Sequence, residues 1–139
     1  MRIYNIQNYQ NQNSFCAAKI LPTKAQWNDL KVFNHHIYEF EKGLRTLILT
    51  TEKESNQAVI ESRLQKRNIS YLIQKVHSDK INVFFGKPES VEVIKSFNQS
   101  NLSKYTPEQD FILGTLLGYD KIQECQRYLK LCRAKEIYK

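Results

Sequence analysis

The stretch LRTLILTTEKESNQAVIESRLQKRNISYLIQKVHSDKINVFFG, residues 44–86, carries the signals that decide the fold. Its first eight residues are β-rich and nearly unbroken in apolar side chains, which predicts a strand over 44–51. SYLIQKV at 70–76 and INVFFG at 81–86 predict two more strands, joined by the polar turn HSDK. The run VFF at 83–85 indicates a strand that is buried on both faces.

A helix is predicted between the first two strands. Thr51 stands three residues before Glu54 in a T-x-x-E capping box, which indicates a helix from there to about residue 67. The positions expected to face inward are Ala58, Ile60 and Leu64. A right-handed crossover then places the third strand centrally, as in half of a ferredoxin-like unit. The first strand becomes a sheet edge that needs cover or a partner, so we expect a homodimer through this edge or through exposed helix faces.

Three further helices are predicted downstream of the sheet. Pro88 begins the first, and Thr106 opens the second, with Pro next and Gln109 completing a capping box. That helix ends at Gly118, and Asp120 caps the last one, which runs to about residue 135 and forms a hairpin with its predecessor. The fold class is therefore α+β: a three-stranded mixed or antiparallel sheet in the order β-α-β-β-α-α-α, packed with about five helices.

The chain of 139 residues suits one domain with a single main core. Asn and Gln dominate up to Asn13, so residues 1–30 are interpreted as an N-terminal extension, partly disordered at its start. Hydrophobic residues such as Trp27 can still pin the second half of this extension onto the domain. Residues 31–139 are predicted to form the single α+β domain.

Composition excludes several classes of protein. No apolar run approaches the roughly 18 residues of a membrane span, and the N-terminal residues resemble neither a signal nor a transit peptide. Three cysteines without a CxxC pair indicate neither a disulfide framework nor a zinc ribbon. We therefore expect reduced thiols and a cytoplasmic location. GxGxxG and GxxxxGK[ST] motifs are absent from the sequence, so no bound cofactor is predicted.

The net charge of +7 is concentrated at the two ends of the chain. Residues 34–120 carry eleven basic and eleven acidic side chains, whereas residues 121–139 carry six basic and two acidic ones. A neutral middle disfavours nucleic-acid binding, so the C-terminal helix is the predicted docking surface for an acidic protein partner. The basic residues expected to guide that partner are Lys121, Arg127, Lys130, Arg133 and Lys135.

The segment NHHIYEFEKG, residues 34–43, is predicted to be a short helical or extended piece ended by Gly43, and it holds the candidate chemistry. On a helix His35 and Glu39 lie one turn apart on one face, an arrangement that can bind a divalent metal or orient an imidazole for proton transfer. A metal site needs a third ligand, for which His77 or Glu41 is a candidate. The competing interpretation is an ordinary hydrogen-bonded histidine, and no metal is predicted.

The two C-terminal cysteines are interpreted as small buried hydrophobes rather than a disulfide, because they lie two helical turns apart. Together with Ile122 and Leu129, Cys125 and Cys132 form an apolar stripe that is expected to face the preceding helix.

The segments VFNHHIYEFEKGLRTLIL, NVFFGKPES and YTPEQDFILGTLLGYDKIQECQRY resemble a small uncharacterised bacterial family, domain-of-unknown-function family 2023. The resemblance covers about residues 31–132. It implies a compact domain of three strands and about five helices, a homodimer, and no established activity. It also implies that some relatives are encoded near a flavodoxin, an acidic FMN protein. We therefore expect a non-catalytic, dimeric binding or adaptor module, with a small enzyme or metal-binding protein that uses His35 and Glu39 as the alternative.

Overall fold

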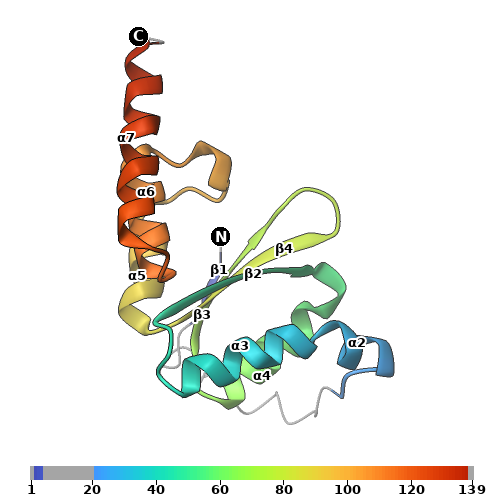
Figure 1. Cartoon of the computed structure of the whole chain (residues 1–139). Coiled ribbons are helices and arrows are strands. Elements are labelled where there is room, and N and C mark those ends of the chain that lie inside the picture. Colours follow the sequence, from blue (N-terminus) through green and yellow to red (C-terminus); the bar gives the residue numbers. More distant parts are fainter. Residues whose placement is uncertain (1, 5–20, 138–139) are drawn as a thin grey trace.

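The structure is a computed structural model that describes residues 2–4 and 21–137. Its centre is an antiparallel sheet with the strand order β1-β3-β4-β2, and helices lie on both sides of it (Figure 1). The strands are β1 (Arg2–Tyr4), β2 (Leu47–Lys53), β3 (Ser70–Lys75) and β4 (Lys80–Gly86). The predicted α+β fold is confirmed, and β1 is a short fourth strand that pairs with β3.

The central position predicted for the third strand of the 44–86 segment is confirmed. This strand is β4, which pairs antiparallel with both β2 and β3, and β2 lies at the sheet edge. Successive side chains of a strand point to opposite faces. Accordingly Val83 and Phe85 join one hydrophobic core, Phe84 joins a second, and all three are fully buried.

Two layers of helices cover the two faces of the sheet (Figure 1). On one face α3 (Lys31–Glu41) and α4 (Gln57–Lys66) supply Phe33, Ile60 and Leu64 to the first core. On the other face α5 (Pro88–Ser96) and α6 (Pro107–Leu116) supply Ile94 and Leu113 to the second. The final helix, α7 (Lys121–Ile137), runs back along α6 and stands away from the sheet. Within residues 2–4 and 21–137, no helix is long and apolar enough to cross a membrane.

Most of the predicted helix boundaries are confirmed by cap geometry. Gly43 follows α3 with a φ of +75°, a left-handed conformation that glycine adopts without strain. Pro88 is the first residue of α5. Thr106 and Gln109 form both hydrogen bonds of the capping box that opens α6. The Asp120 carboxylate accepts a hydrogen bond of 2.9 Å from the Gln123 backbone N–H at the start of α7.

The capping box predicted at Thr51 and Glu54 is wrong. β2 continues through Lys53, a 3₁₀ turn (Glu54–Asn56) follows, and α4 begins only at Gln57. Thr51 stays in the strand because its hydroxyl donates a 2.8 Å hydrogen bond to Asn82 Oδ1 on β4. Ile60 and Leu64 face inward as predicted, but Ala58 is exposed and Val59 is buried, because positions 58 and 60 of a helix point about 200° apart.

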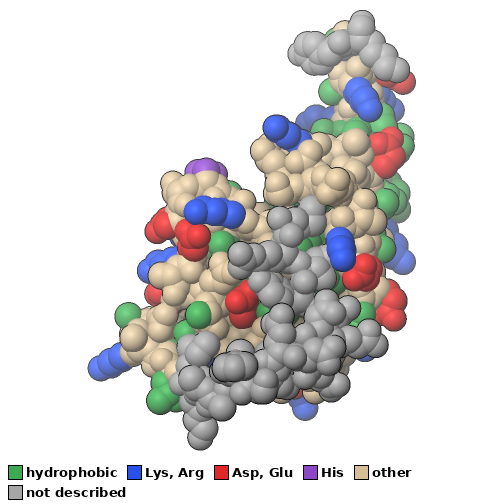
Figure 2. Space-filling model, turned by 180° about the vertical axis from the view of Figure 1, so that it is seen from behind, with side chains coloured by type: hydrophobic (Ala, Val, Ile, Leu, Met, Phe, Trp, Pro, Cys, Tyr) green, Lys and Arg blue, Asp and Glu red, His purple; other side chains and the backbone are tan. Residues whose placement is uncertain are grey.

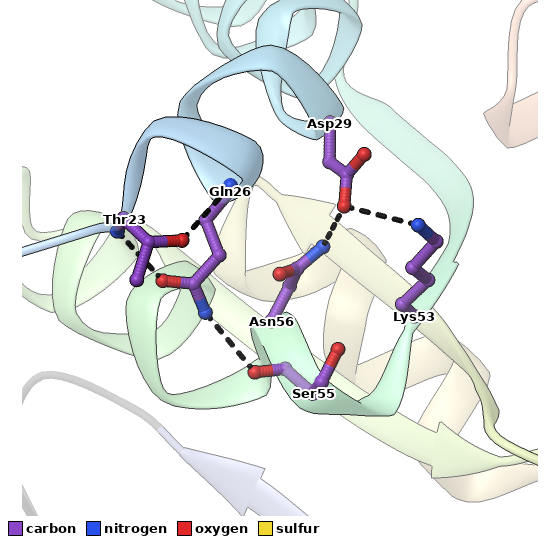
Figure 3. A network of polar contacts seen from close by, with 6 residues as sticks. All are labelled: Thr23, Gln26, Asp29, Lys53, Ser55 and Asn56. Carbon is purple, nitrogen blue, oxygen red and sulfur yellow. Dashed lines mark hydrogen bonds and ion pairs between the residues drawn. The ribbon is translucent and has the colours of Figure 1, made fainter.

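A short helix, α2 (Lys24–Asp29), lies within the predicted extension and is tied to the end of β2 by side-chain contacts (Figure 3). Asp29 Oδ2 lies 3.2 Å from Lys53 Nζ and accepts a 3.4 Å hydrogen bond from Asn56 Nδ2. Gln26 Nε2 donates to the Ser55 carbonyl at 3.3 Å. Because residues 5–20 lie outside the described part of the chain, the domain boundary at residue 30 and the disorder stay predictions.

Replacing Phe85 tests how strongly the fold depends on β4. The Phe85 ring is fully buried and meets Phe33 edge-on at 5.4 Å between centroids. We expect Phe85→Ala to lower the free energy of unfolding by about 3–5 kcal/mol, because the cavity left behind cannot refill. Urea denaturation measures the change.

The matched control is Val93→Ala on α5, where the side chain is 36% exposed. This substitution is expected to lower the free energy of unfolding by less than about 1 kcal/mol. Equal losses for the two variants would contradict the central role assigned to β4.

Candidate functional site

The α6–α7 hairpin is held together by polar and aromatic contacts. Arg127 donates two hydrogen bonds to the Asp110 carboxylate, at 2.8 Å from Nε and 3.1 Å from Nη2, and this partner raises the pKa of Arg127. The Tyr128 ring lies 5.7 Å from that of Phe111, and its hydroxyl donates to Glu108 at 3.5 Å. α7 continues beyond the start of α6, so its last turns have no neighbouring helix (Figure 1).

The prediction that the apolar stripe of α7 faces α6 is wrong. Ile122 is 66% and Leu129 50% exposed, and Cys125 is exposed as well. The buried position of α7 is instead Glu124, which lies against Gly114 of α6. A Cβ at position 114 would collide with the Glu124 carboxylate. The missing side chain of Gly114 therefore admits Glu124 to the contact and turns the apolar stripe outward.

The outward stripe forms one wall of an open apolar groove along the hairpin. The groove has a volume of about 540 Å³ and is lined by Glu108, Phe111, Ile112, Cys125, Tyr128 and Leu129. The space-filling view shows hydrophobic side chains beside charged ones along the part of the molecule that holds the α6–α7 hairpin (Figure 2). An exposed apolar groove on a helix pair is a recurrent surface for binding another protein.

The five predicted docking residues all lie on α7, but they differ in their surroundings. Arg127 is engaged by Asp110. The other four are exposed, and within the described residues none of them makes an ion pair; they are Lys121, Lys130, Arg133 and Lys135. At about 100° per residue, Lys130 lies about 140° around the helix from Cys125, whereas Lys121 and Arg133 flank the apolar stripe. Lys121 and Arg133 therefore border the groove.

The two histidines of the NHHIYEFEKG segment meet a single carboxylate. His35 Nε2 lies 3.0 Å from Glu39 Oε1, and His36 Nδ1 lies 3.6 Å from Oε2, beyond hydrogen-bond length. Arg45 Nη1 contacts the same carboxylate at 3.5 Å. Partial burial raises the pKa of Glu39, but Arg45 and the two histidines outweigh it and hold that pKa below 4.5.

The predicted pair of His35 and Glu39 is thus in contact, and His36 is a third member that the spacing argument did not anticipate. His77 lies in the turn between β3 and β4. Within residues 2–4 and 21–137, no group of three or more His, Cys, Asp or Glu side chains is arranged to hold a metal ion. The enzyme or metal-binding alternative stays a prediction, and the His35 side chain is 65% exposed.

A family model described as a protein of unknown function (DUF2023) matches residues 31–131 of this chain. The chain belongs to the DUF2023 family. No curated protein matches it.

The DUF2023 match begins at the first residue of α3 and ends within α7. It therefore contains the three long strands, the Glu39 cluster and the groove, which are the parts that carry the predicted chemistry. The match excludes α2 and β1, which nonetheless pack on the DUF2023 domain through Asp29 and through the pairing of β1 with β3.

Sequence reasoning missed a further cluster, made where α2 meets α4. Arg63 lies over the ring of Trp27 at 4.9 Å and donates a 2.6 Å hydrogen bond to Asn34. The only sequence signal was RLQKR at 63–67, which places three cations within one helical turn and a half. The neutral charge count over residues 34–120 concealed it, because that count sums acidic side chains that lie elsewhere.

Replacing Glu39 tests the electrostatics of its cluster. Because the folded-state pKa of Glu39 lies below its usual value of 4.5, the charged carboxylate stabilises the fold above that pH. The contribution is lost as the pH falls through the lowered pKa. We expect Glu39→Gln to be less stable than the wild type at about pH 7, with a smaller difference at about pH 3, as measured by urea unfolding.

The control is Glu92→Gln on α5, an exposed carboxylate without an ion pair in the described part of the chain. It is expected to follow the wild type at both pH values. A Glu39→Gln loss of stability that persists unchanged in acid would rule out the electrostatic origin.

Proposed function

We propose that this DUF2023 protein is a non-catalytic binding module whose α6–α7 hairpin docks an acidic protein. The supporting observation is an exposed apolar groove bordered by cations that have no carboxylate partner among the described residues. Such cations attract an acidic surface over distances of about 8–10 Å, and the groove then supplies the buried area.

The groove has the composition of an interface centre. Phe111 and Tyr128 stand in aromatic contact, and Leu129 is half exposed beside them. Aromatic side chains dominate the binding energy of protein interfaces, whereas charges at the rim mainly set the rate and partner choice. A partner that fits both features carries an apolar ridge flanked by Asp and Glu.

The partner candidate that the family resemblance supplies is a flavodoxin-type electron carrier. Its acidic surface complements Lys121, Arg133 and Lys135 of α7. The encounter belongs in the bacterial cytoplasm, where the free thiols of Cys125 and Cys132 stay reduced.

We also propose that the module is a homodimer joined through β2. This strand lies at the sheet edge, next to Leu44, which is 71% exposed. Its outer backbone groups can form hydrogen bonds with the same strand of a second copy. Pairing of two identical edges about a two-fold axis gives a closed dimer, in which neither copy leaves this edge open.

Charge reversal tests the docking surface. We expect Lys121→Glu combined with Arg133→Glu to weaken binding to purified flavodoxin by about tenfold or more and to remove most of its salt dependence. Arg127 is left intact, because reversing it would also break its ion pair with Asp110. Calorimetry at low and high salt measures both effects.

The matched control carries the same change in net charge on the far side of the molecule. Lys24→Glu with Lys31→Glu alters exposed residues of α2 and α3 and is expected to retain most of the affinity. If the two double variants weaken binding equally, only overall charge matters, and the α7 surface is not the docking site. A wild type that does not bind flavodoxin removes that partner.

The dimer proposal predicts a change of mass for an edge variant. Thr51 is exposed on β2, so Thr51→Lys brings two like charges together across a two-fold edge contact. Light scattering should give a dimer for the wild type and a monomer for Thr51→Lys, whereas Ser100→Lys, on an exposed loop, should stay dimeric. A monomeric wild type would refute the proposal.

A further inference from the structure

A cationic pocket lies between α2, α3 and α4, on the opposite side of the sheet from α5 and α6 (Figure 1). Its volume is about 390 Å³, at the lower end of the range for small-molecule sites. The residues that line it are Trp27, Asn34, Ile37, Arg63, Lys66 and Arg67. None of them belongs to the groove on the α6–α7 hairpin.

The positive charge of this pocket is only partly neutralised. Arg67 pairs with Glu41 at 2.6 Å, but within the described residues neither Arg63 nor Lys66 makes an ion pair. The first acidic residue of the sequence is Asp29, so the whole segment before it contains no carboxylate side chain that could approach them. Burial and the neighbouring charge of Arg67 both lower the pKa of Arg63. An anion would relieve this repulsion.

Two side chains hold Arg63 in a defined orientation. The guanidinium group stacks over Trp27 at 4.9 Å, and Nη1 donates to Asn34 Oδ1 at 2.6 Å. Arg63 has five N–H donors in a planar fork, so the edge away from Asn34 remains for a bidentate contact with a phosphate. Both contacts fix this edge before a ligand arrives, which lowers the entropic cost of binding.

Trp27 is also held in place, although its indole is 55% exposed. Its neighbours in α2 attach to the end of β2, with Gln26 bonded to the Ser55 carbonyl and Asp29 bonded to Lys53 and Asn56 (Figure 3). These contacts fix the α2 backbone that carries Trp27, and Arg63 covers one face of the ring, so the other face can serve as a platform for a base. An exposed aromatic face next to basic side chains is the combination that binds the base and the phosphate of a nucleotide.

We propose that this pocket binds a nucleotide, with the phosphate on Arg63 and Lys66 and the base on the face of the Trp27 ring that Arg63 leaves uncovered. A phosphate without a base would use the cations alone and leave the Trp27 platform empty. The nucleotide is either free or one unit of a single strand, since both present the same base and phosphate. The pocket joins α2, which lies outside the DUF2023 match, to helices inside it.

The experiment uses the full chain, in which Trp27 is the one tryptophan and thus a reporter within the pocket. Adenosine monophosphate, adenosine, inorganic phosphate and a short single-stranded oligoadenylate are titrated in turn by calorimetry and by tryptophan fluorescence. We expect saturable binding of adenosine monophosphate and a change in tryptophan fluorescence. The affinities for adenosine and for phosphate should each be lower than that for adenosine monophosphate by about tenfold or more.

Two variants tie the binding to the pocket. Lys66→Glu places a carboxylate beside the phosphate, and we expect it to lower the affinity for adenosine monophosphate by about tenfold or more. Arg63→Lys keeps the charge but loses the planar fork, and should lower the affinity as well. Lys95→Glu on α5, exposed on the other side of the sheet, is the control and should bind as the wild type does.

The oligonucleotide distinguishes the two sources of the nucleotide. If the oligonucleotide binds at least about tenfold more tightly than adenosine monophosphate, the pocket binds one nucleotide of a single strand. If the two affinities are comparable, the ligand is a free nucleotide. Absence of saturable binding by both, or equal weakening in Lys66→Glu and Lys95→Glu, would overturn the proposal. Neither result bears on the docking of an acidic protein, which uses α7.

Discussion

The structure depends on β4 being apolar on both of its faces. A strand with Val83 and Phe85 on one side and Phe84 on the other cannot leave either side in water, because each face would expose several large side chains. The sheet must therefore be covered twice. The same strand pairs on both edges, with β3 and with β2, so all of its backbone groups in the sheet have partners.

This double cover gives the molecule two chemically different sides. The α2–α4 layer gathers Trp27, two cations of α4 and Arg67 directly after it around a small pocket, while the other layer extends into a hairpin with an apolar groove and exposed cations. The Glu39 cluster lies on α3, where one carboxylate contacts two imidazoles and a guanidinium group. Basic charge is thus present on both sides, but it stands beside an exposed tryptophan on one and beside an apolar groove on the other.

Local signals in the sequence were sufficient for the elements that form by local interactions. The caps at Gly43, Pro88 and Thr106 are set by backbone geometry and by contacts within four residues, and each was predicted correctly. The continuous apolar run at 83–85 likewise predicted a central strand that is buried on both faces. The capping box at Thr51 failed because a contact between strands, from Thr51 to Asn82, competes with the local cap, and no local pattern reports that competition.

Contacts between helices were less predictable than the helices themselves. The apolar stripe of α7 suggested the wrong contact face, since hydrophobic spacing alone does not say which side of a helix its neighbour occupies. The Trp27–Arg63 stack joins residues 36 positions apart and needs the docking of α2 before it exists. The family match, which supplies a boundary but no activity, could not reveal that stack because Trp27 lies outside it.

The contact of Glu124 with Gly114 has a consequence for how the family can vary. A Cβ at position 114 would meet the end of the Glu124 side chain, so a larger residue there requires that carboxylate to move aside or a shorter residue at 124, and a small residue at 124 would leave a void over Gly114. The two positions should therefore change together among related sequences, ten residues apart, as a compensated pair of sizes. In members that carry alanine or a larger residue at 114 together with a long residue at 124, either the side chain at 124 moves aside or α7 shifts, and in the second case a different row of side chains is presented to a partner.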